Sequence, residues 1–319
     1  MNQNTHGPSV ETKIKTKRWK IIVPVVIAVV LVVSLVGVYL FLNRGTVVTP
    51  KTLTVDENGP ADFSTIREAI NAANAGDTIQ VASGTYNESY IETKKALTLL
   101  GENKSTTIID GKGITGAVIA VKADNVNISG FTIRNAAWGT AGIYVGQASG
   151  CTVRQNEITS NTGGYGISLY HSSNNEVSDN LITSNERGID FDHSSNNTIH
   201  NNTISNNVDG IYLSYESKFN TFSNNTIVDN SYHGIYYYSY YGELPCNDNT
   251  LYHNNFINNT VQVSSFEATN TWDNDYPSGG NYWSDHTCTG NPSDGSHPYT
   301  IDTNNTDHYP FENPNGWSP

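Results

Sequence analysis

Residues 188–207 read GIDFDHSSNNTIHNNTISNN, and this stretch decides the fold. It holds short apolar pieces separated by Ser and Asn: Ile189 with Phe191, then Thr198-Ile199, then Thr203-Ile204. Pieces this short cannot make helices, and their alternation of apolar and polar residues is typical of strands. The stretch therefore predicts short strands joined by corners, and its two carboxylates and one histidine need a separate explanation.

The same pattern recurs along the chain. Gly-Ile pairs begin at residues 142, 166, 188, 210 and 234, so they are 24, 22, 22 and 24 residues apart, and an earlier copy starts near Ala117. Short strands at such a period are typical of a parallel β-helix, in which each repeat is one coil that stacks on the last at about 4.8 Å. The sequence thus predicts an all-β fold, a single-stranded parallel β-helix, over residues 52–261.

Asparagine marks the corners of these coils. Asn161, Asn185, Asn207 and Asn230 each come three residues after an Ile of the repeat. Asn tolerates the left-handed backbone of a sharp corner, and a stacked column of Asn can pass side-chain hydrogen bonds from coil to coil. We therefore expect these residues to adopt left-handed conformations and to form such a column.

Both ends of a stack of coils need a cover, because open strand edges invite aggregation. Residues 62–74 form an amphipathic pattern, and Thr65 with Glu68 fits a helix capping box. This pattern predicts a short N-terminal capping helix. After the repeats the period dissolves, and residues 262–319 contain Trp272, Trp283 and Trp317. We expect that segment to be an irregular C-terminal cap.

The N-terminal part reads as a membrane anchor. Ile21–Leu42 contains no charged residue and is 22 residues long, which is enough for a helix to span a bilayer. A cleaved signal peptide is the alternative, but it would have a shorter apolar core and a small-residue cleavage site. Residues 1–20 are basic and predict a cytoplasmic N-terminus. Residues 43–51 would be a linker, and the β-helix would lie outside the cell or in the periplasm.

The charge distribution narrows the choice of partners. Residues 1–50 hold six basic residues and Glu11, a net charge of +5, so the whole-chain charge of −13 leaves −18 for the rest. No Lys or Arg follows Lys218. Nucleic acid, which needs a basic surface, is therefore excluded as a partner.

The three cysteines suit an oxidising compartment. Cys246 and Cys288 lie in turn-rich segments and are the plausible disulfide pair, whereas Cys151 begins a strand-like run and is expected to pack inside. Their spacing matches no zinc motif, and we assign no metal ligand from the sequence.

The residues that the repeat does not require are Asp190, Asp192 and His193, the candidate catalytic residues. If Ile189 and Phe191 point inward, both aspartates point outward on the same face. Stacking would place Ser168 and Tyr170 on one side of them, and Tyr212 and Ser214 on the other. The candidate substrate-binding residues that share this face are Tyr170, His171, Arg187, Tyr212, Tyr215, Tyr236 and Tyr238.

Several motifs resemble known families. Residues 52–111, with DFSTIREAINAANAGDTIQVASGTYNES, resemble the first coils of pectin methylesterases. Residues 118–260, with SGFTIRN and repeated N-x-I-x-x-N, resemble the NosD-type domain, also described as a carbohydrate-binding and sugar-hydrolase (CASH) repeat. The tail, with YPSGGNYWSDH, is similar to the closing segment of archaeal cell-surface members. The resemblance implies a right-handed, pectate-lyase-like solenoid outside the membrane.

The same resemblance bears on cofactors. NosD implies a role in copper-centre maturation, and copper prefers His, Cys or Met ligands, but Met1 is the only Met of the sequence. Related tails carry an acidic loop that suggests calcium. Here the corresponding segment, residues 288–297, has Asp294 as its one carboxylate, so Ca²⁺ stays open as a cofactor.

Four functions compete for this pattern. Aromatic rings beside carboxylates suit sugars, so we favour a membrane-anchored protein that binds a polysaccharide or other surface glycan. A structural surface protein without a ligand, a polysaccharide lyase or glycosidase, and a NosD-like copper-maturation accessory are the alternatives. Catalysis by paired carboxylates would require one acid with a raised pKa, and nothing in the sequence indicates a group that desolvates Asp190 or Asp192.

Overall fold

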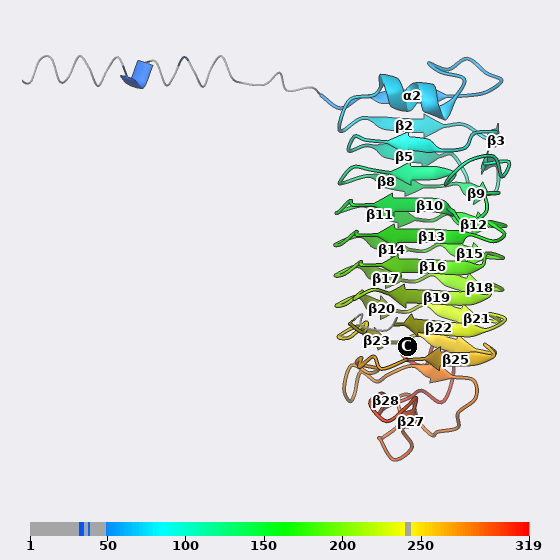
Figure 1. The fold of residues 1–319 in the computed structure, drawn as a ribbon, viewed down its shortest axis with the longest axis vertical. Helices are drawn as coiled ribbons and strands as arrows, with labels where there is room; N and C mark the ends of the chain where they lie inside the picture. Colours follow the sequence, from blue (N-terminus) through cyan, green and yellow to red (C-terminus); the bar gives the residue numbers. More distant parts are fainter. Residues whose placement is uncertain (1–31, 35–37, 39–48, 240–243, 319) are drawn as a thin grey trace, which may run out of the picture. The chain divides into compact units, whose positions relative to one another are not determined.

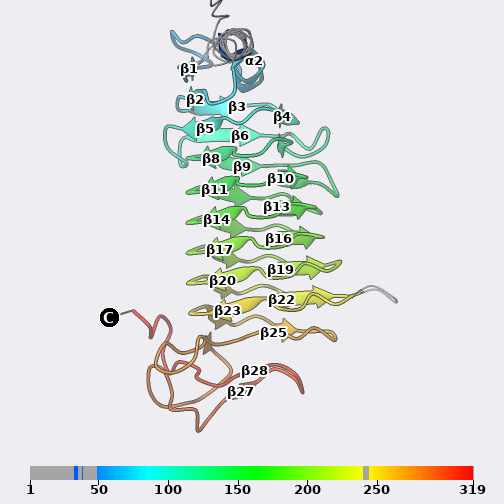
Figure 2. The ribbon, with the colours of Figure 1, turned by 90° about the vertical axis from the view of Figure 1, so that its left-hand side faces the viewer.

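The computed structural model describes residues 32–34, 38, 49–239 and 244–318. From Pro50 onward the chain forms one compact unit, a right-handed parallel β-helix whose coils stack from helix α2 to the C-terminal segment (Figures 1 and 2). The predicted all-β fold class is confirmed. Within the described residues, no helix combines the length and the hydropathy needed to cross a membrane. Most of the predicted span Ile21–Leu42 lies outside the described residues.

A complete coil contributes one strand to each of three parallel sheets. Sheet A contains β1 (Thr52–Val55), β2 (Thr78–Val81), β5 (Thr98–Gly101), β8 (Asn127–Ser129), β11 (Thr152–Arg154), β14 (Glu176–Ser178), β17 (Thr198–His200), β20 (Thr221–Ser223) and β23 (Thr250–Tyr252). Sheet B contains β3 (Gly84–Tyr86), β6 (Thr107–Asp110), β9 (Thr132–Arg134), β12 (Glu157–Thr159), β15 (Leu181–Thr183), β18 (Thr203–Ser205), β21 (Thr226–Val228), β24 (Asn255–Ile257) and β26 (Tyr282–Trp283). Sheet C contains β4 (Ile91–Thr93), β7 (Ile119–Val121), β10 (Ala141–Gly146), β13 (Tyr165–Tyr170), β16 (Arg187–Asp192), β19 (Asp209–Ser214), β22 (His233–Tyr238) and β25 (Val261–Ser264).

The opening stretch has the predicted local structure. Its three apolar pieces are strands β16, β17 and β18, and Ile189, Phe191, Ile199 and Ile204 are fully buried. Because no coil can bury its inward face alone, equivalent Ile residues of successive coils pack on one another to make the core.

Glycine is required at the repeated position because adjacent coils leave no room there for a Cβ atom. A Cβ atom at Gly166 would lie 2.6 Å from the carbonyl oxygen of Gly188, and one at Gly210 would lie 2.6 Å from that of Gly234. Real Cβ atoms do not approach backbone so closely, and an Ile methyl group and an Asn amide crowd the same place. Any side chain here would push adjacent coils apart, which explains the Gly-Ile period.

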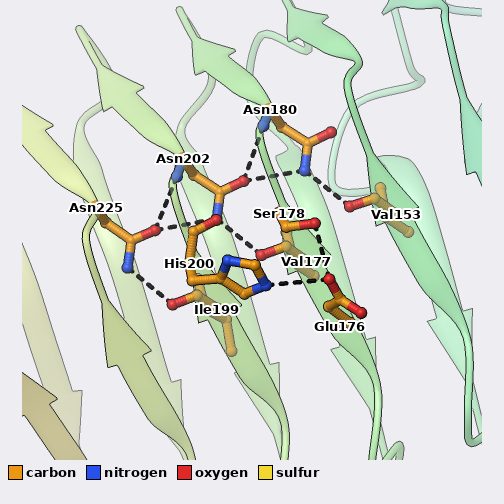
Figure 3. Close-up of polar contacts among 9 residues, drawn as sticks. All are labelled: Val153, Glu176, Val177, Ser178, Asn180, Ile199, His200, Asn202 and Asn225. Atoms are coloured by element: carbon orange, nitrogen blue, oxygen red, sulfur yellow. Dashed lines mark hydrogen bonds and ion pairs between the residues drawn. The ribbon is translucent and has the colours of Figure 1, made fainter.

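The predicted Asn column exists and is one of three such ladders. Asn161, Asn185, Asn207, Asn230 and Asn259 form a continuous chain of buried side-chain hydrogen bonds between sheets B and C. A second ladder runs between sheets A and B, and its middle members are drawn in Figure 3; a third runs between sheets C and A. In each ladder the amide oxygen accepts from the backbone N–H of the previous coil's Asn.

The predicted left-handed conformation belongs to other residues. Positive φ angles occur at Ser160, Ser184, Asn206 and Asp229, each directly before a ladder Asn. The prediction for the ladder residues themselves was therefore wrong. The residue before makes the sharp turn, and this turn aims the following amide into the stack.

The predicted capping helix is α2 (Ile66–Ala72), which packs on β1, β2 and β4. The Thr65 hydroxyl accepts a hydrogen bond from the Glu68 N–H, as the capping box requires. The ammonium group of Lys95 donates to the carbonyls of Ile70, Asn71 and Ala73, and so satisfies the C-terminal end of the helix.

The C-terminal segment covers the last coils, as expected for a cap. Trp272 and Trp283 are buried, and the Trp283 ring stacks on Phe256 with centroids 4.3 Å apart. Strand β26 adds to sheet B, and β27 (Tyr299–Thr300) pairs with β28 (Thr306–Asp307) in a short antiparallel ribbon. Asn281 and Asp307 extend the second Asn ladder into this cap.

The plausible disulfide between Cys246 and Cys288 is not formed in the structure. Among the described residues, Cys151, Cys246 and Cys288 are all buried and unpaired. Cys246 belongs to the core cluster of the β-helix, whereas the Cys288 thiol donates to the carbonyl of Pro310 inside the cap. Burial raises the pKa of Cys246 to about 11, so this thiol stays protonated and unreactive. Cys151 packs inside, as expected.

Candidate functional site

The candidate site lies on the outer face of sheet C, where the predicted stacking order is confirmed. Asp190 of β16 lies between Ser168 of β13 and Tyr212 of β19. Asp192 likewise lies between Tyr170 and Ser214. In Figure 1 these strands follow one another down the front of the stack. The register brings the predicted residues together because parallel strands place equivalent residues side by side.

A groove of about 610 Å³ runs across this face. Seven of the predicted site residues line it: Tyr170, Arg187, Asp190, Asp192, Tyr212, Tyr215 and Tyr238. His171, His193 and Tyr236 are not part of its lining, although Tyr236 packs against Tyr212 with ring centroids 5.3 Å apart. The groove is of the size that small-molecule and oligomer sites usually have.

Asp190 is buried, contrary to the expectation that nothing desolvates it. Its exposed fraction is 5% because the neighbouring side chains close over it. The Arg187 guanidinium donates to Asp190 Oδ1 at 2.6 Å, and the Ser168 hydroxyl donates to Oδ2 at 3.4 Å. Burial raises the pKa of Asp190, and the adjacent Arg187 charge offsets part of that rise. Asp190 and Arg187 thus form a hydrogen-bonded ion pair at the floor of the groove.

Tyr212 holds this pair in place. The centroid of its ring lies 3.3 Å from the guanidinium carbon of Arg187. The Tyr165 ring, on the neighbouring strand β13, lies 5.2 Å from the same carbon. Tyr212 is only 7% exposed, and burial raises the pKa of its hydroxyl. The Arg187 guanidinium therefore covers this face of the Tyr212 ring, so a ligand cannot stack on it.

Other rings are more accessible. Tyr170 is 37% exposed and stacks on Tyr144 with centroids 6.1 Å apart. The Lys122 ammonium lies 4.3 Å from the centroid of Tyr144. Tyr215 and Tyr238 pack edge to face near the other end of the groove. Aromatic faces at both ends thus border a polar centre.

His171 and His193 form a stack beside the groove. They occupy the same corner position on successive coils, and their rings are 4.5 Å apart and 15° from parallel. Tyr215 continues the stack, 5.2 Å from His193 and 3° from parallel. The His193 Nδ1 lies 2.6 Å from Asp192 Oδ1, so this carboxylate holds the ring. Two of the predicted site residues are therefore bound to each other.

Sequence reasoning missed Tyr90, Lys122 and Tyr165 as lining residues. Lys122 follows Val121, which is in register with Val145, so Lys122 aligns with Gly146, and Gly146 is in register with Tyr170 one coil further on. Extending the repeat back by two coils from Tyr170 therefore indicates the place of Lys122 on the same face. Tyr165 directly precedes a repeat Gly, as does Arg187, and that shared position was available as a signal. Tyr90 precedes β4 and carried no signal of this kind.

The fold and this groove define a class, a parallel β-helix with an aromatic and charged groove on one outer sheet. Residues 70–288, well over half of the chain, match the family model described as "Periplasmic copper-binding protein (NosD)". The chain therefore belongs to the NosD family, and the resemblance seen in the sequence is confirmed.

Two curated relatives are similar over part of their length. A "Cell surface glycoprotein" of Methanothermus fervidus is 35% identical over 103 residues, which cover 32% of this chain and 16% of that protein. A "Probable pectinesterase/pectinesterase inhibitor 41" of Arabidopsis thaliana is 31% identical over 109 residues, which cover 29% of this chain and 19% of that protein. The chain thus spans less than a fifth of each relative.

Solved structures with a similar trace include the A-module of the mannuronan C-5 epimerase AlgE4 of Azotobacter vinelandii. It is 16% identical, with a TM-score of 0.49 over 64% of this chain and 69% of that chain. Pectin methylesterase PemA of Erwinia chrysanthemi is 14% identical, with a TM-score of 0.45 over 69% of this chain and 81% of that chain.

The family description raises the question of whether these residues suit copper. Thiolate and thioether ligands select Cu(I), but the three cysteines are buried and Met1, the only methionine, lies outside the described residues. Imidazole and carboxylate suit a divalent ion such as Cu(II) instead. His171, Asp192 and His193 offer that donor set, with one ligand atom each and all three atoms within 4.8 Å of one another.

Proposed function

We propose that the groove on sheet C binds a chain of sugar residues. The observation that carries this proposal is the groove itself: about 610 Å³, bordered by accessible tyrosine rings around a charged floor. Tyrosine presents an apolar ring face and a polar hydroxyl, which suits the alternating apolar and hydroxylated surfaces of sugars. The bound Arg187–Asp190 pair fixes the floor, and Asp192 and Lys122 add hydrogen-bonding groups at its edges.

We place this binding outside the membrane. The family description names a periplasmic protein, and the relative from Methanothermus fervidus is a cell-surface protein. The uncharged stretch Ile21–Leu42 would anchor the chain, and the basic residues before it would keep the N-terminus in the cytoplasm. The ligand would then be a polysaccharide or glycan of the cell envelope or its surroundings.

The test is a glycan screen with the full chain in detergent, followed by affinity electrophoresis in gels that contain each retained polysaccharide. Tyr170→Ala should lower the affinity at least tenfold, because it removes an exposed tyrosine ring that lines the groove. Tyr232→Ala is the matched control, since Tyr232 is 55% exposed and lies outside the groove. Equal affinity of both variants, or no retained glycan, would overturn the proposal.

A second candidate, cleavage of the bound glycan, is favoured by one observation. Asp190 and Asp192 lie two residues apart on one strand and both line the groove, about 6.7 Å apart between Cα atoms, which is within the spacing of paired glycosidase carboxylates. Release of reducing ends or unsaturated products that is lost in Asp192→Asn, with glycan retention intact, would establish it. Retention without any product would leave binding as the function.

A further inference from the structure

We propose that Trp138 is a sugar-stacking platform that extends the groove of sheet C to the corner between sheets B and C. Its side chain is 85% exposed, the largest exposed fraction of any large apolar residue in the described part of the chain. The two residues that follow it, Gly139 and Thr140, line the groove. This inference rests on the proposed function, because it assigns a further contact to the same glycan, and it identifies that glycan as an oligomer or polymer rather than a single sugar.

Trp138 lies in a corner that is longer than the repeat requires. Residues 135–140 join β9 to β10, whereas only residues 184–186 join β15 to β16 and only residues 206–208 join β18 to β19. The shorter corners show that three residues are enough to turn the chain from sheet B to sheet C. Inserted corner residues are where solenoid proteins usually carry their binding contacts, and here the insertion lies beside the groove.

Hydrogen bonds hold this corner to the coils on both sides of it. The Ala137 N–H donates to the carbonyl of Gly116 at 3.3 Å, and the Gly139 N–H donates to the carbonyl of Gly163 at 2.7 Å. The indole lies so close to Gly163 that a Cβ atom there would overlap its Cδ1 and Nε1 atoms. The ring is therefore positioned by the backbone of the next coil while most of its surface faces solvent. Because the ring is already ordered, a ligand that stacks on it loses little further side-chain entropy.

Tyr90 provides a second ring at the same end of the groove. It directly precedes β4, is 45% exposed and lines the groove. Its ring packs on Gly116, whose carbonyl also holds the corner of Trp138. Strand β4 is two coils from β10, so the two rings are separated by about 10 Å along the stack. That separation exceeds the width of one sugar ring, so the two platforms contact different sugars of one chain.

The experiment uses the full chain in detergent, a polysaccharide retained in the glycan screen, and fragments of that polysaccharide of graded length. Calorimetry compares their affinities for the unsubstituted protein and for the variants Trp138→Ala and Trp138→Tyr. Tyr232→Ala is the matched control, because Tyr232 is an exposed ring at the same corner, directly before β22. Of the residues of β22, only Tyr238 lines the groove.

Trp138→Ala should bind the polymer at least fivefold more weakly, but should bind the shortest retained fragments as the unsubstituted protein does, because these fragments occupy the groove without reaching the corner. Trp138→Tyr should restore most of the affinity, and Tyr232→Ala should leave it unchanged. Unchanged polymer affinity in Trp138→Ala, or an equal loss for the polymer and the shortest fragments, would overturn the platform.

Tryptophan fluorescence provides a second readout. Trp272 and Trp283 are buried and Trp317 is half-buried, whereas Trp138 is exposed. Polymer binding should therefore shift the emission of the unsubstituted protein to shorter wavelengths, and Trp138→Tyr should bind without this shift. A retained polymer that causes no shift, or the same shift in Trp138→Tyr, would refute the platform and leave the groove proposal in place. If no glycan is retained at all, both proposals are refuted.

Discussion

Removal of one ladder amide, Asn202→Ala, should destabilise the β-helix far more than its small change in volume suggests. Asn202 is 1% exposed and lies in the second Asn ladder, between sheets A and B (Figure 3). Its Oδ1 accepts from the backbone N–H and the side-chain amide of Asn180, both at 3.0 Å. Its Nδ2 donates to the carbonyl of Val177 at 2.8 Å and to that of His200 at 2.9 Å.

The magnitude follows from the groups that lose their partners. The Asn180 side chain keeps its bond to Val153, and Asn225 Oδ1 keeps the Asn202 backbone N–H, so neither is orphaned. The backbone N–H of Asn180 and the carbonyl of Val177 each lose a ladder bond at a buried corner. Leaving the buried Asn180 N–H without a partner costs about 1–3 kcal/mol, so the free energy of unfolding should fall by at least about that amount.

The assay is urea unfolding of the full chain, followed by far-ultraviolet circular dichroism. Asn127→Ala is the control, because Asn127 is exposed on β8 and makes one long bond of 3.4 Å to Thr98. It should change stability by no more than about 0.5 kcal/mol. If Asn202→Ala is no more harmful than this control, the ladder bonds do not stabilise the coils and the reasoning is refuted.

Three further predictions use the same unfolding measurement. Gly188→Ala should cost at least about 3 kcal/mol, because the new methyl group meets the backbone of the next coil. Arg187→Gln should cost about 2–4 kcal/mol and more at pH 8 than at pH 5, because Asp190, left buried without its cation, is stable only when protonated. Burial raises the pKa of Asp307 to about 7, so this group stabilises the cap below about pH 4, and that stability is lost as the pH rises to about 7. Asp307→Asn should abolish this slope in thermal melts monitored by Trp fluorescence, and a variant that keeps the slope would assign it to another group.

The fold could be predicted because its strongest requirement is periodic. Stacking forces Gly166, Gly188 and Gly210 to lack a side chain, and this requirement appears directly in the sequence as a period. The corners were predicted less well. In pairs such as Asn201-Asn202, the first residue makes the left-handed turn and the second joins the ladder. Composition cannot distinguish these roles, because both favour Asn, so two of the three ladders were missed.

The candidate site was predictable in its register and unpredictable in its side-chain contacts. Parallel stacking alone gives the neighbours of Asp190 and Asp192. It does not say that Arg187 and Tyr212 fold over Asp190 and bury it, because that depends on rotamers chosen among several crowded side chains. The contact between His193 and Asp192 also depends on rotamers, so the sequence did not predict it. We had expected each of these residues to act on a ligand instead.

The depth of the groove has a simple origin in the outward residues of sheet C. Each coil presents two such positions, and from β7 to β19 most coils pair a large residue with a small one. Small side chains beside large ones leave a hollow, and the large rings of neighbouring coils become its walls. At β22 both positions are tyrosine, and there only Tyr238 reaches the groove. Because inward and corner positions are fixed by stacking, these outward pairs can vary freely, and ligand choice in such a protein should depend on them: Ala120 and Lys122, Tyr144 and Gly146, Ser168 and Tyr170, Asp190 and Asp192, Tyr212 and Ser214, Tyr236 and Tyr238.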